Sequence, residues 1–261
     1  MIKKCIIPAA GKGSSWQPIS EFVPKEMFPL LNYPVIHYTF QEAFRSGLNQ
    51  IAIVITYDKE IIRNYLYRNF GDFMEQGLTV EFVYQEDAFG LGDAILQCEH
   101  FVQGEPFVVL IPDDVFFFHC FPIVKLVDAY AQEEDIGSLL GLISVEKDLL
   151  RYYTGFNLQK KSPQLYSINK FYSKDDVDVK ISSSYKNSLR IVGRYVLSSI
   201  VFEYLHEIKN EFNEADFSEI KLFENMVIGG EKVLGTILKD ICFDVGTLHG
   251  YVRANDTFFY Y

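Results

Sequence analysis

The first half of the chain alternates apolar segments of strand length with segments of helical periodicity, and this pattern constrains the fold most. Four segments have strand character: residues 3–11, 50–57, 78–85 and 106–117. Three helical segments lie between them: residues 34–48, residues 58–70, where Asp58 is the expected N-cap, and residues 90–102, which are expected to form a loop and a helix. Such alternation predicts a parallel sheet with helices on both faces. The nearly continuous apolar strands fit a sheet that is covered on both sides.

The second half of the chain has a different pattern. Its expected elements are a buried strand at 136–145, short polar strands within 151–197, helices at 198–209 and 219–229, and two strands, a turn and a helix within 233–255. No repeat, low-complexity stretch or linker interrupts the sequence. We therefore expect one α/β domain over residues 1–261, with a Rossmann-like, mixed and mostly parallel sheet and a small β insertion near 146–195 on the substrate side.

Composition excludes several classes of function. The formal net charge is −11 and no Lys/Arg-rich stripe is present, which argues against nucleic-acid binding. A phosphate ligand would therefore be a small one. No segment approaches the ~20 apolar residues of a membrane span, and the apolar run after Lys4 is too short for a signal peptide. The four cysteines lack CxxC spacing, so we expect free thiols in the cytoplasm.

A glycine-rich loop, Ala-Ala-Gly-Lys-Gly-Ser-Ser, follows the first predicted strand. Glycines let backbone N–H groups approach phosphate oxygens. Lys12 is the only cation between Gly11 and Pro24, however, and Trp16 replaces the third glycine of a dinucleotide-binding fingerprint. Taken alone, the loop fits a phosphate cradle and a simple tight turn equally well.

Two aspartates each follow an apolar strand, Asp113 in Pro-Asp-Asp and Asp244 in Phe-Asp-Val-Gly. Ligands of open parallel sheets bind beyond the carboxyl ends of the strands. If both strands lie in one sheet, the two carboxylates could share one Mg²⁺, which takes one or two carboxylates and fills its other positions with water and phosphate oxygens. The alternative is a solvated turn in which the aspartate caps the next segment.

Taken in order, several segments resemble the sugar-nucleotide pyrophosphorylases, a family of nucleotidyltransferases, and within it the bacterial uridylyltransferases. The most specific are Pro-Lys-Glu-Met-x-Pro-Leu from Pro24, Gly-Leu-Gly-x-Ala from Gly90 and Asp-x-Gly-x-x-x-Gly-Tyr from Asp244. The resemblance covers essentially the whole chain. It implies the nucleotide-diphospho-sugar transferase fold, with a nucleotide-binding half at 1–118 and a sugar-phosphate-binding half at 119–261.

The resemblance also implies a reaction. UMP would pass from UTP to glucose-1-phosphate, or a similar sugar-1-phosphate, with release of pyrophosphate. Attack in line on the α-phosphorus needs positioning and charge neutralisation rather than a covalent nucleophile. Mg²⁺ would be the cofactor, a homodimer is expected, and polysaccharide biosynthesis is the expected use of the product.

Site residues follow from the resemblance by position in its motifs. On the nucleotide side, the backbone of Ala10, Gly11 and Gly13 would cradle the nucleotide, Gln85 would bind the uracil edge, Gly90 would pack near the base and Asp113 would complete the site. Lys25 and Lys170 would be the catalytic cations. On the sugar side the residues would be Gly155, Asn169 and Lys170, and Asp113 and Asp244 would hold Mg²⁺.

The chain departs from the family pattern in four places. Ser15 replaces the loop arginine, Glu21 replaces a lysine, and Asn169-Lys170-Phe171 replaces Glu-Lys-Pro. The helical excursion before the glutamine strand is nearly absent. One alternative is therefore a weakly active or non-catalytic relative that binds nucleotide or sugar nucleotide and regulates another protein. A second is a transferase for dTTP or CTP with another phosphorylated acceptor.

Overall fold

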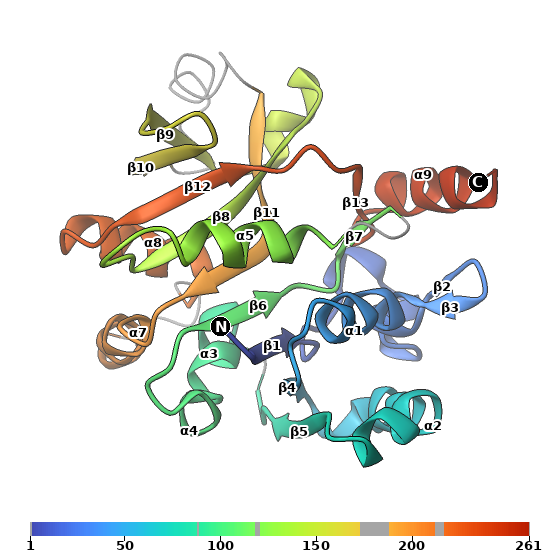
Figure 1. The fold of residues 1–261 in the computed structure, drawn as a ribbon. Helices are drawn as coiled ribbons and strands as arrows, with labels where there is room; N and C mark the ends of the chain where they lie inside the picture. The colour runs from blue at the N-terminus through green and yellow to red at the C-terminus, as the bar shows by residue number, and fades with distance from the viewer. Residues whose placement is uncertain (1, 88, 118–120, 173–187, 212–216, 261) are drawn as a thin grey trace.

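The computed structural model describes residues 2–87, 89–117, 121–172, 188–211 and 217–260. Within them, one nine-stranded sheet runs through both halves of the chain in the order β5-β4-β1-β6-β11-β8-β12-β10-β9. Helices cover both of its faces (Figure 1). The predicted mixed α/β fold with a mostly parallel sheet is confirmed.

The first four strands of the sheet are parallel to one another: β1 (Lys4–Pro8), β4 (Gln50–Ile55), β5 (Thr79–Tyr84) and β6 (Phe107–Leu110). The others are β8 (Ser138–Ser144), β9 (Gly155–Lys160), β10 (Leu165–Tyr172), β11 (Leu189–Leu197) and β12 (Val233–Ile237). Only β10 and β11 of these described strands run against the rest.

Strand parity explains the two buried layers. Along β1, Cys5 and Ile7 point to one face of the sheet and Ile6 to the other, as period-2 alternation requires. The first face carries α1 (Val35–Arg45), α2 (Glu60–Glu75) and α5 (Pro122–Tyr130). The second carries α3 (Leu91–Leu96), α4 (Glu99–Val102), α7 (Val201–Asn210) and α8 (Glu219–Ile228). None of the described helices is both long and apolar enough to cross a membrane.

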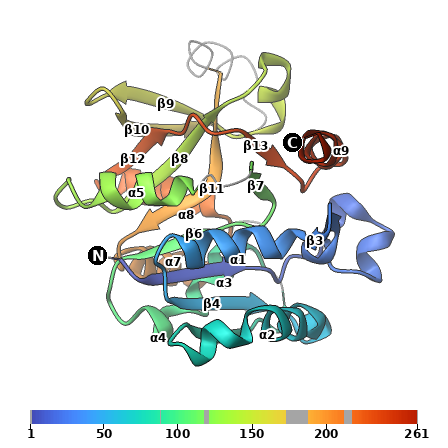
Figure 2. The same ribbon diagram turned by 45° about the vertical axis from the view of Figure 1, so that its right-hand side comes forward.

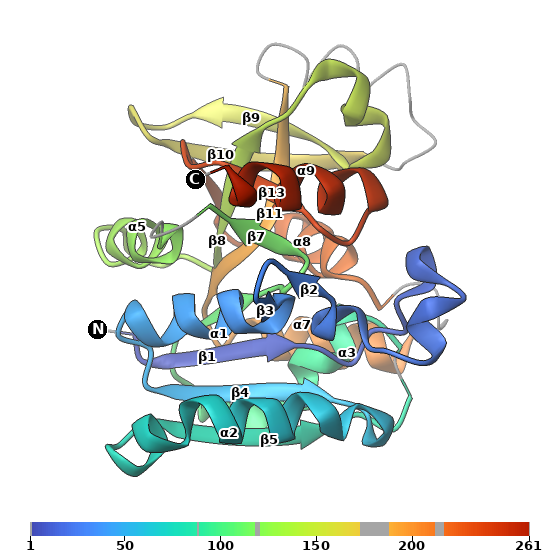
Figure 3. The ribbon, with the colours of Figure 1, turned by 90° about the vertical axis from the view of Figure 1, so that its right-hand side faces the viewer.

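Two small sheets extend from this core. β2 (Pro29–Leu30) pairs with β3 (Tyr33–Pro34), and β7 (Asp114–Phe116) pairs antiparallel with β13 (Cys242–Asp244). The C-terminal helix α9 (Leu248–Phe259) packs against the β7–β13 sheet through Ala254 and Phe258 (Figures 2 and 3). The β7–β13 pairing thus brings residues 242–244, near the end of the chain, next to residues 114–116, near its middle.

The structure corrects several predicted elements. Residues 106–117 are not one strand, because the chain turns after Leu110 and β7 joins a different sheet. Asp58 is not the N-cap of α2, because it lies in a 3₁₀ turn before it. The predicted helix at 90–102 divides into α3 and α4, and α2 continues beyond Phe70 to Glu75. Residues 173–187 of the expected insertion lie outside the described residues, and its β9–β10 hairpin is an edge of the main sheet.

Candidate functional site

The glycine loop leaves the carboxyl end of β1 at the centre of the sheet. Its backbone turns sharply at Gly13, which has a φ of 66° in the left-handed region. A β-carbon there would also lie 3.0 Å from the β-carbon of Ser20. Both the conformation and the space therefore require glycine at this position.

Lys59, in the turn before α2, anchors the glycine loop by hydrogen bonds to its backbone. Its Nζ donates to the carbonyl oxygens of Ala9 and Gly11, at 2.8 and 2.7 Å, and to Glu26 Oε2 at 2.9 Å. Burial raises the pKa of Glu26, and Lys59 opposes that rise. Sequence reasoning did not identify Lys59, since nothing in the local pattern distinguishes a buried lysine from a solvated one at a helix start.

Lys25 points the other way from its neighbour Glu26 and forms an ion pair with Asp113. Its Nζ also lies 4.0 Å from the position of a β-carbon on Gly11. Burial by itself would lower the pKa of Lys25, but Asp113 and Glu26 hold it above its ordinary value. Pro-Lys-Glu-Met thus supplies one cation paired with Asp113 and one carboxylate that accepts a hydrogen bond from Lys59, the residue that anchors the loop.

Asp113 and Asp244 converge at Gly246. A β-carbon on Gly246 would lie 2.9 Å from Asp113 Oδ2 and 3.1 Å from Asp244 Oδ1. The two residues meet through the β7–β13 pairing rather than as strand ends of the main sheet, and Val245 N donates to Asp113 O at 2.7 Å. Burial, together with the nearby carboxylates of Asp114 and Asp113, raises the pKa of Asp244 to about 6.

The donor set beside Gly246 suits one magnesium ion. Mg²⁺ takes one or two carboxylates and fills its other positions with water and phosphate oxygens, and Asp113 and Asp244 each bring one carboxylate oxygen to this side of Gly246. The described residues contain no group of three or more His, Cys, Asp or Glu suited to hold a metal. A closed protein cage, as in a structural zinc site, is therefore not what the described residues offer.

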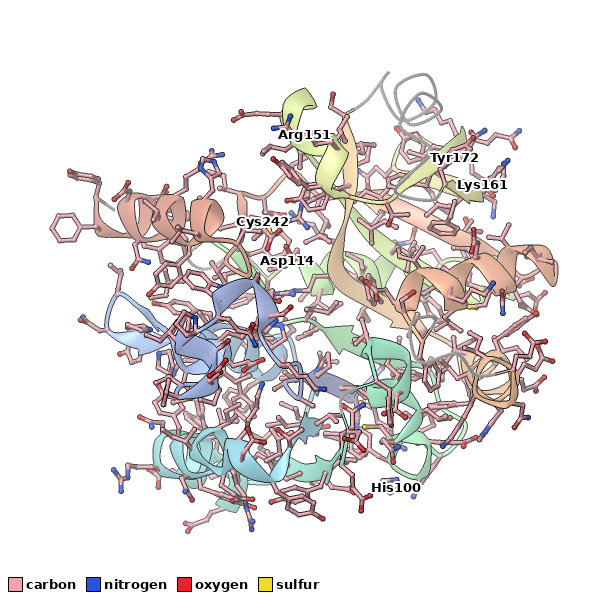
Figure 4. The ribbon with its side chains drawn as sticks, turned by 180° about the vertical axis from the view of Figure 1, so that it is seen from behind. His100, Asp114, Arg151, Lys161, Tyr172 and Cys242 are labelled. Atoms are coloured by element: carbon pink, nitrogen blue, oxygen red, sulfur yellow. The ribbon has the colours of Figure 1, made fainter. Side chains whose placement is uncertain are left out.

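A second layer of charge lies behind the pair. Asp114 accepts hydrogen bonds from Arg190 Nη2 at 2.5 Å and Gly193 N at 2.7 Å. Burial disfavours its charge, yet Arg190 and the Gly193 amide hold the pKa of Asp114 below its ordinary value. In Figure 4, Asp114 and Cys242 lie side by side where the small sheet meets the main one. Sequence reasoning missed Arg190, although a charged residue inside an apolar strand is a signal that a buried partner exists.

Tyr153 links this layer to Asp244. Its Oη donates to Asp244 Oδ2 at 3.1 Å, and the Arg190 guanidinium lies 4.9 Å from the centre of its ring. Burial and the neighbouring carboxylates raise the pKa of Tyr153, so the phenol keeps the proton that it donates. Sequence reasoning did not single out this residue either.

Gln85 and Gly90 lie together at the predicted nucleotide end. Gln85 is buried and its amide donates to the Asp93 carboxylate. Gly90 has a φ of 124°, and a β-carbon there would collide with the backbone carbonyl of Phe217. A cavity of about 430 Å³ adjoins them, lined by Tyr84, Gln85, Glu86, Asp87, Phe89, Asp93, Gln97, Lys209 and Phe217. The tight backbone contact that only glycine allows is therefore made with Phe217.

The predicted sugar-side residues are only partly brought together. Gly155 is buried and pairs with Tyr172, whereas Lys170 pairs with Asn157, two places along the hairpin. Lys170 is exposed with its Nζ 5.3 Å from the Tyr172 ring centre, and Asn169 is exposed and bonds Gln159 Oε1 at 3.3 Å. A cavity of about 460 Å³ lies beside this hairpin, lined by Tyr152, Tyr153, Thr154, Tyr172, Ile191, Tyr195, Ser218, Glu219, Ile220 and Glu224.

Ser15, where the resemblance leads us to expect arginine, ties the loop to the acidic pair. Its Oγ donates to the backbone carbonyl of Gly246 at 2.8 Å. The bond connects the glycine loop to the turn that follows Asp244, although the two are 231 residues apart in sequence. At the position where the resemblance predicts an arginine side chain, the Ser15 hydroxyl therefore links the glycine loop to the turn after Asp244.

The chain is similar to known proteins over nearly its whole length. A model of the nucleotidyl transferase family matches residues 4–259. A UTP–glucose-1-phosphate uridylyltransferase of Mycoplasma pneumoniae is 30% identical over 97% of this chain and 91% of its own length. The UTP–glucose-1-phosphate uridylyltransferase 2 of Staphylococcus saprophyticus is 33% identical over 78% of this chain and 74% of its own.

Solved structures give the same picture. A UDP-glucose pyrophosphorylase in complex with UDP-glucose superposes with a TM-score of 0.84 at 25% identity, over 100% of this chain and 99% of that one. A UTP-bound enzyme of the same kind from Acinetobacter baumannii has a TM-score of 0.81 at 26% identity, over 99% and 93% of the two chains. The resemblance stated from the motifs is confirmed at the level of the family.

Proposed function

The chain belongs to the nucleotidyl transferase family, and on that premise we propose that it transfers UMP from UTP to glucose-1-phosphate and releases pyrophosphate. The observation that carries the proposal is the convergence of Asp113 and Asp244 beside Lys25 and the glycine loop. This group of fixed charges supports the proposal, because loss of pyrophosphate from a nucleoside triphosphate requires charge neutralisation. The names of the related enzymes support UTP and glucose-1-phosphate as the substrates.

The residues have distinct roles in the proposed reaction. The backbone of Ala10, Gly11 and Gly13 cradles the phosphates, and Lys25 supplies a positive charge between the loop and Asp113. Asp113 and Asp244 hold Mg²⁺, which when bound neutralises charge on the phosphates. The protein contributes position and electrostatics, because in-line phosphoryl chemistry needs no covalent nucleophile.

The two substrates would occupy the two ends of the site. Gln85, whose amide is oriented by Asp93, binds the uracil edge, with Gly90 close to the base. The Gly155 backbone faces the sugar, and Lys170 serves the sugar phosphate after moving from its place over Tyr172. Asn169 offers an uncharged acceptor to sugar hydroxyls. We also propose that residues 1–261 act as one domain, that the protein is a cytoplasmic homodimer, and that its product serves polysaccharide biosynthesis.

A regulatory relative without full activity is the second candidate. Two observations favour it. The Ser15 hydroxyl donates a hydrogen bond to the Gly246 carbonyl instead of supplying a positive charge, and Glu21 is exposed where the family pattern has a lysine. In that case the site would bind nucleotide or sugar nucleotide without rapid turnover. A binding assay with UTP or UDP-glucose distinguishes this candidate from a protein that neither turns over nor binds these nucleotides.

A substrate panel tests the proposed function. Pyrophosphate release is measured in Mg²⁺ with glucose-1-phosphate and either UTP, dTTP or CTP, and then with UTP and other sugar-1-phosphates. We expect UTP with glucose-1-phosphate to have the highest kcat/KM. A preference for dTTP or CTP would replace the uridylyl assignment with the third possibility, a transferase of other specificity.

A further inference from the structure

Asp114, Arg190, Tyr153 and Asp244 form a closed ring of contacts next to the acidic pair. Asp114 holds the Arg190 guanidinium at 2.5 Å, and Arg190 lies against the ring of Tyr153. Tyr153 Oη then donates to Asp244 Oδ2 at 3.1 Å. The ring closes through the β7–β13 sheet, in which Asp244 and Asp114 are directly paired.

Within this ring of contacts, the two carboxylate oxygens of Asp244 have different neighbours. Oδ2 accepts a hydrogen bond from the Tyr153 hydroxyl, whereas Oδ1 lies at the Gly246 side, where Asp113 Oδ2 also lies. The terminal χ2 torsion of an aspartate is broad, so a carboxylate with only one partner has a poorly defined orientation. A hydrogen bond to one oxygen therefore fixes the direction of the other, which is how an outer contact orients a metal ligand.

Tyr153 also touches the neighbouring cavity. Its ring forms part of the wall of the 460 Å³ cavity together with Tyr152 and Tyr172. The side chain thus has its hydroxyl at the acidic pair and its ring at the cavity beside Gly155. The Arg190 side chain is almost fully buried, with an exposure of 5%. Its guanidinium therefore gives the aromatic ring of Tyr153 a fixed surface to stack on.

We propose that Tyr153 is a positioning residue of the carboxylate pair: its hydroxyl, held by the stack on Arg190, keeps Asp244 turned toward Asp113. The same side chain joins the cation site to the adjoining cavity. This inference rests on the function proposed above, because it assigns the acidic pair to a divalent cation. It predicts that removal of the phenol hydroxyl alone, with the ring kept in place against Arg190, weakens cation binding.

Titration of the protein with Mn²⁺ alone, followed by the electron paramagnetic resonance signal of the free ion, tests the proposal without turnover. We expect Tyr153→Phe to raise the Kd for Mn²⁺ by about tenfold, the usual effect of one hydrogen bond to a charged group. Tyr152→Phe is the matched control, because Tyr152 lines the same cavity and is 59% exposed. It should leave the Kd within about twofold of the wild-type value.

A second variant separates position from charge. Arg190→Lys keeps a cation for Asp114 but loses the flat surface that stacks on Tyr153, so its Kd for Mn²⁺ should lie between those of the wild type and Tyr153→Phe. In steady-state assays, Tyr153→Phe should lower kcat at limiting Mg²⁺, recover at high Mg²⁺, and leave the KM for glucose-1-phosphate unchanged. A merely structural role would not give this rescue by the metal.

The outcomes are distinct. Selective weakening by Tyr153→Phe, with rescue by excess metal, supports the proposal. Mn²⁺ affinity equal to wild type in Tyr153→Phe overturns the positioning role and leaves the proposed function standing. If the wild type binds no Mn²⁺ with or without UTP, the cation assignment of the proposed function fails and the positioning role fails with it.

Discussion

Asp113 and Asp244 each present one carboxylate oxygen to the same point, the position that a β-carbon on Gly246 would occupy. They are brought together by a two-stranded sheet whose strands contain three residues each. Lys25 forms an ion pair with Asp113 and Tyr153 donates to Asp244, so each carboxylate is held by a different part of the chain. A compact acidic centre thus lies beside the glycine loop.

Gly246→Ala should disable this centre with little effect on stability. The new methyl group would lie 2.9 Å from Asp113 Oδ2 and 3.1 Å from Asp244 Oδ1, closer than van der Waals contact, so the carboxylates would have to move. Gly246 is not among the glycines with positive φ, so alanine meets no backbone penalty. We expect at least about a tenfold loss of Mn²⁺ affinity, measured by titration, with Tm nearly unchanged. Gly71→Ala, at a position with open space, is the control, and equal losses in both variants would contradict the account.

Lys25→Ala should lower kcat by about 10² or more, by analogy with the loss of one preorganised charge contact. Lys25 is the cation that faces Asp113 and the glycine loop, whereas Lys12 is exposed within the same loop. Lys12→Ala is therefore the matched comparison and should change kcat less than about threefold. Steady-state pyrophosphate release measures both. Similar losses of kcat in the two variants would contradict the assignment of Lys25 as the cation that acts on the phosphates.

Ser15→Arg should raise kcat by about tenfold or more, since a cation on the leaving pyrophosphate is worth about 10²–10³ in rate, partly offset by the lost bond to Gly246. Ser15→Ala removes only that bond, and we expect a change of at most about fivefold. Single-turnover rates with saturating UTP distinguish the two effects. An unchanged rate in Ser15→Arg would mean that another group already supplies the charge.

The cation-free protein should gain stability as the pH falls through about 6, because of Asp244. Its pKa is raised to about 6 in the folded protein from an ordinary value of 3.8. The folded state therefore binds the proton more tightly than the unfolded chain, and this stabilisation is lost as the pH rises through 6. Asp244→Asn should exceed the wild type in unfolding free energy by on the order of 1–2 kcal/mol at pH 8, and by less at pH 5.

Urea unfolding in a chelator, at several pH values, measures that difference. Asp72→Asn is the control, because Asp72 lies exposed on α2 and should show no such trend. A difference between Asp244→Asn and wild type that stays constant from pH 5 to pH 8 would contradict the raised pKa.

Local patterns in the sequence carry much of the fold. Short apolar runs such as Ile51–Ile55 and Leu139–Ile143 are typical of buried strands, and their alternation with helical segments favours a layered α/β fold. The glycine loop and Asp113 were identifiable because each follows such a strand. The division of residues 106–117 was not, since a three-residue strand such as β7 takes its partner from β13, more than a hundred residues away.

The same limit explains the parts of the site that sequence reasoning missed. Lys59 and Arg190 act through buried partners, Glu26 and Asp114, that lie far from them in sequence. Periodicity records whether a face is apolar and carries no information on which distant charge meets a buried lysine or arginine. Arg194, which donates to Glu42 through both Nε and Nη2 from within an apolar strand, is the same kind of signal.

Pyrophosphate release by the wild-type chain with Mg²⁺, UTP and glucose-1-phosphate, beside Asp244→Asn, tests the central claim most directly. We predict turnover by the wild type and a loss of about 10² or more in kcat for Asp244→Asn, with UTP still bound. Equal rates in the two proteins would contradict the role of the acidic pair. No turnover by the wild type, with UTP or UDP-glucose bound, would contradict the proposed transferase and favour the regulatory relative.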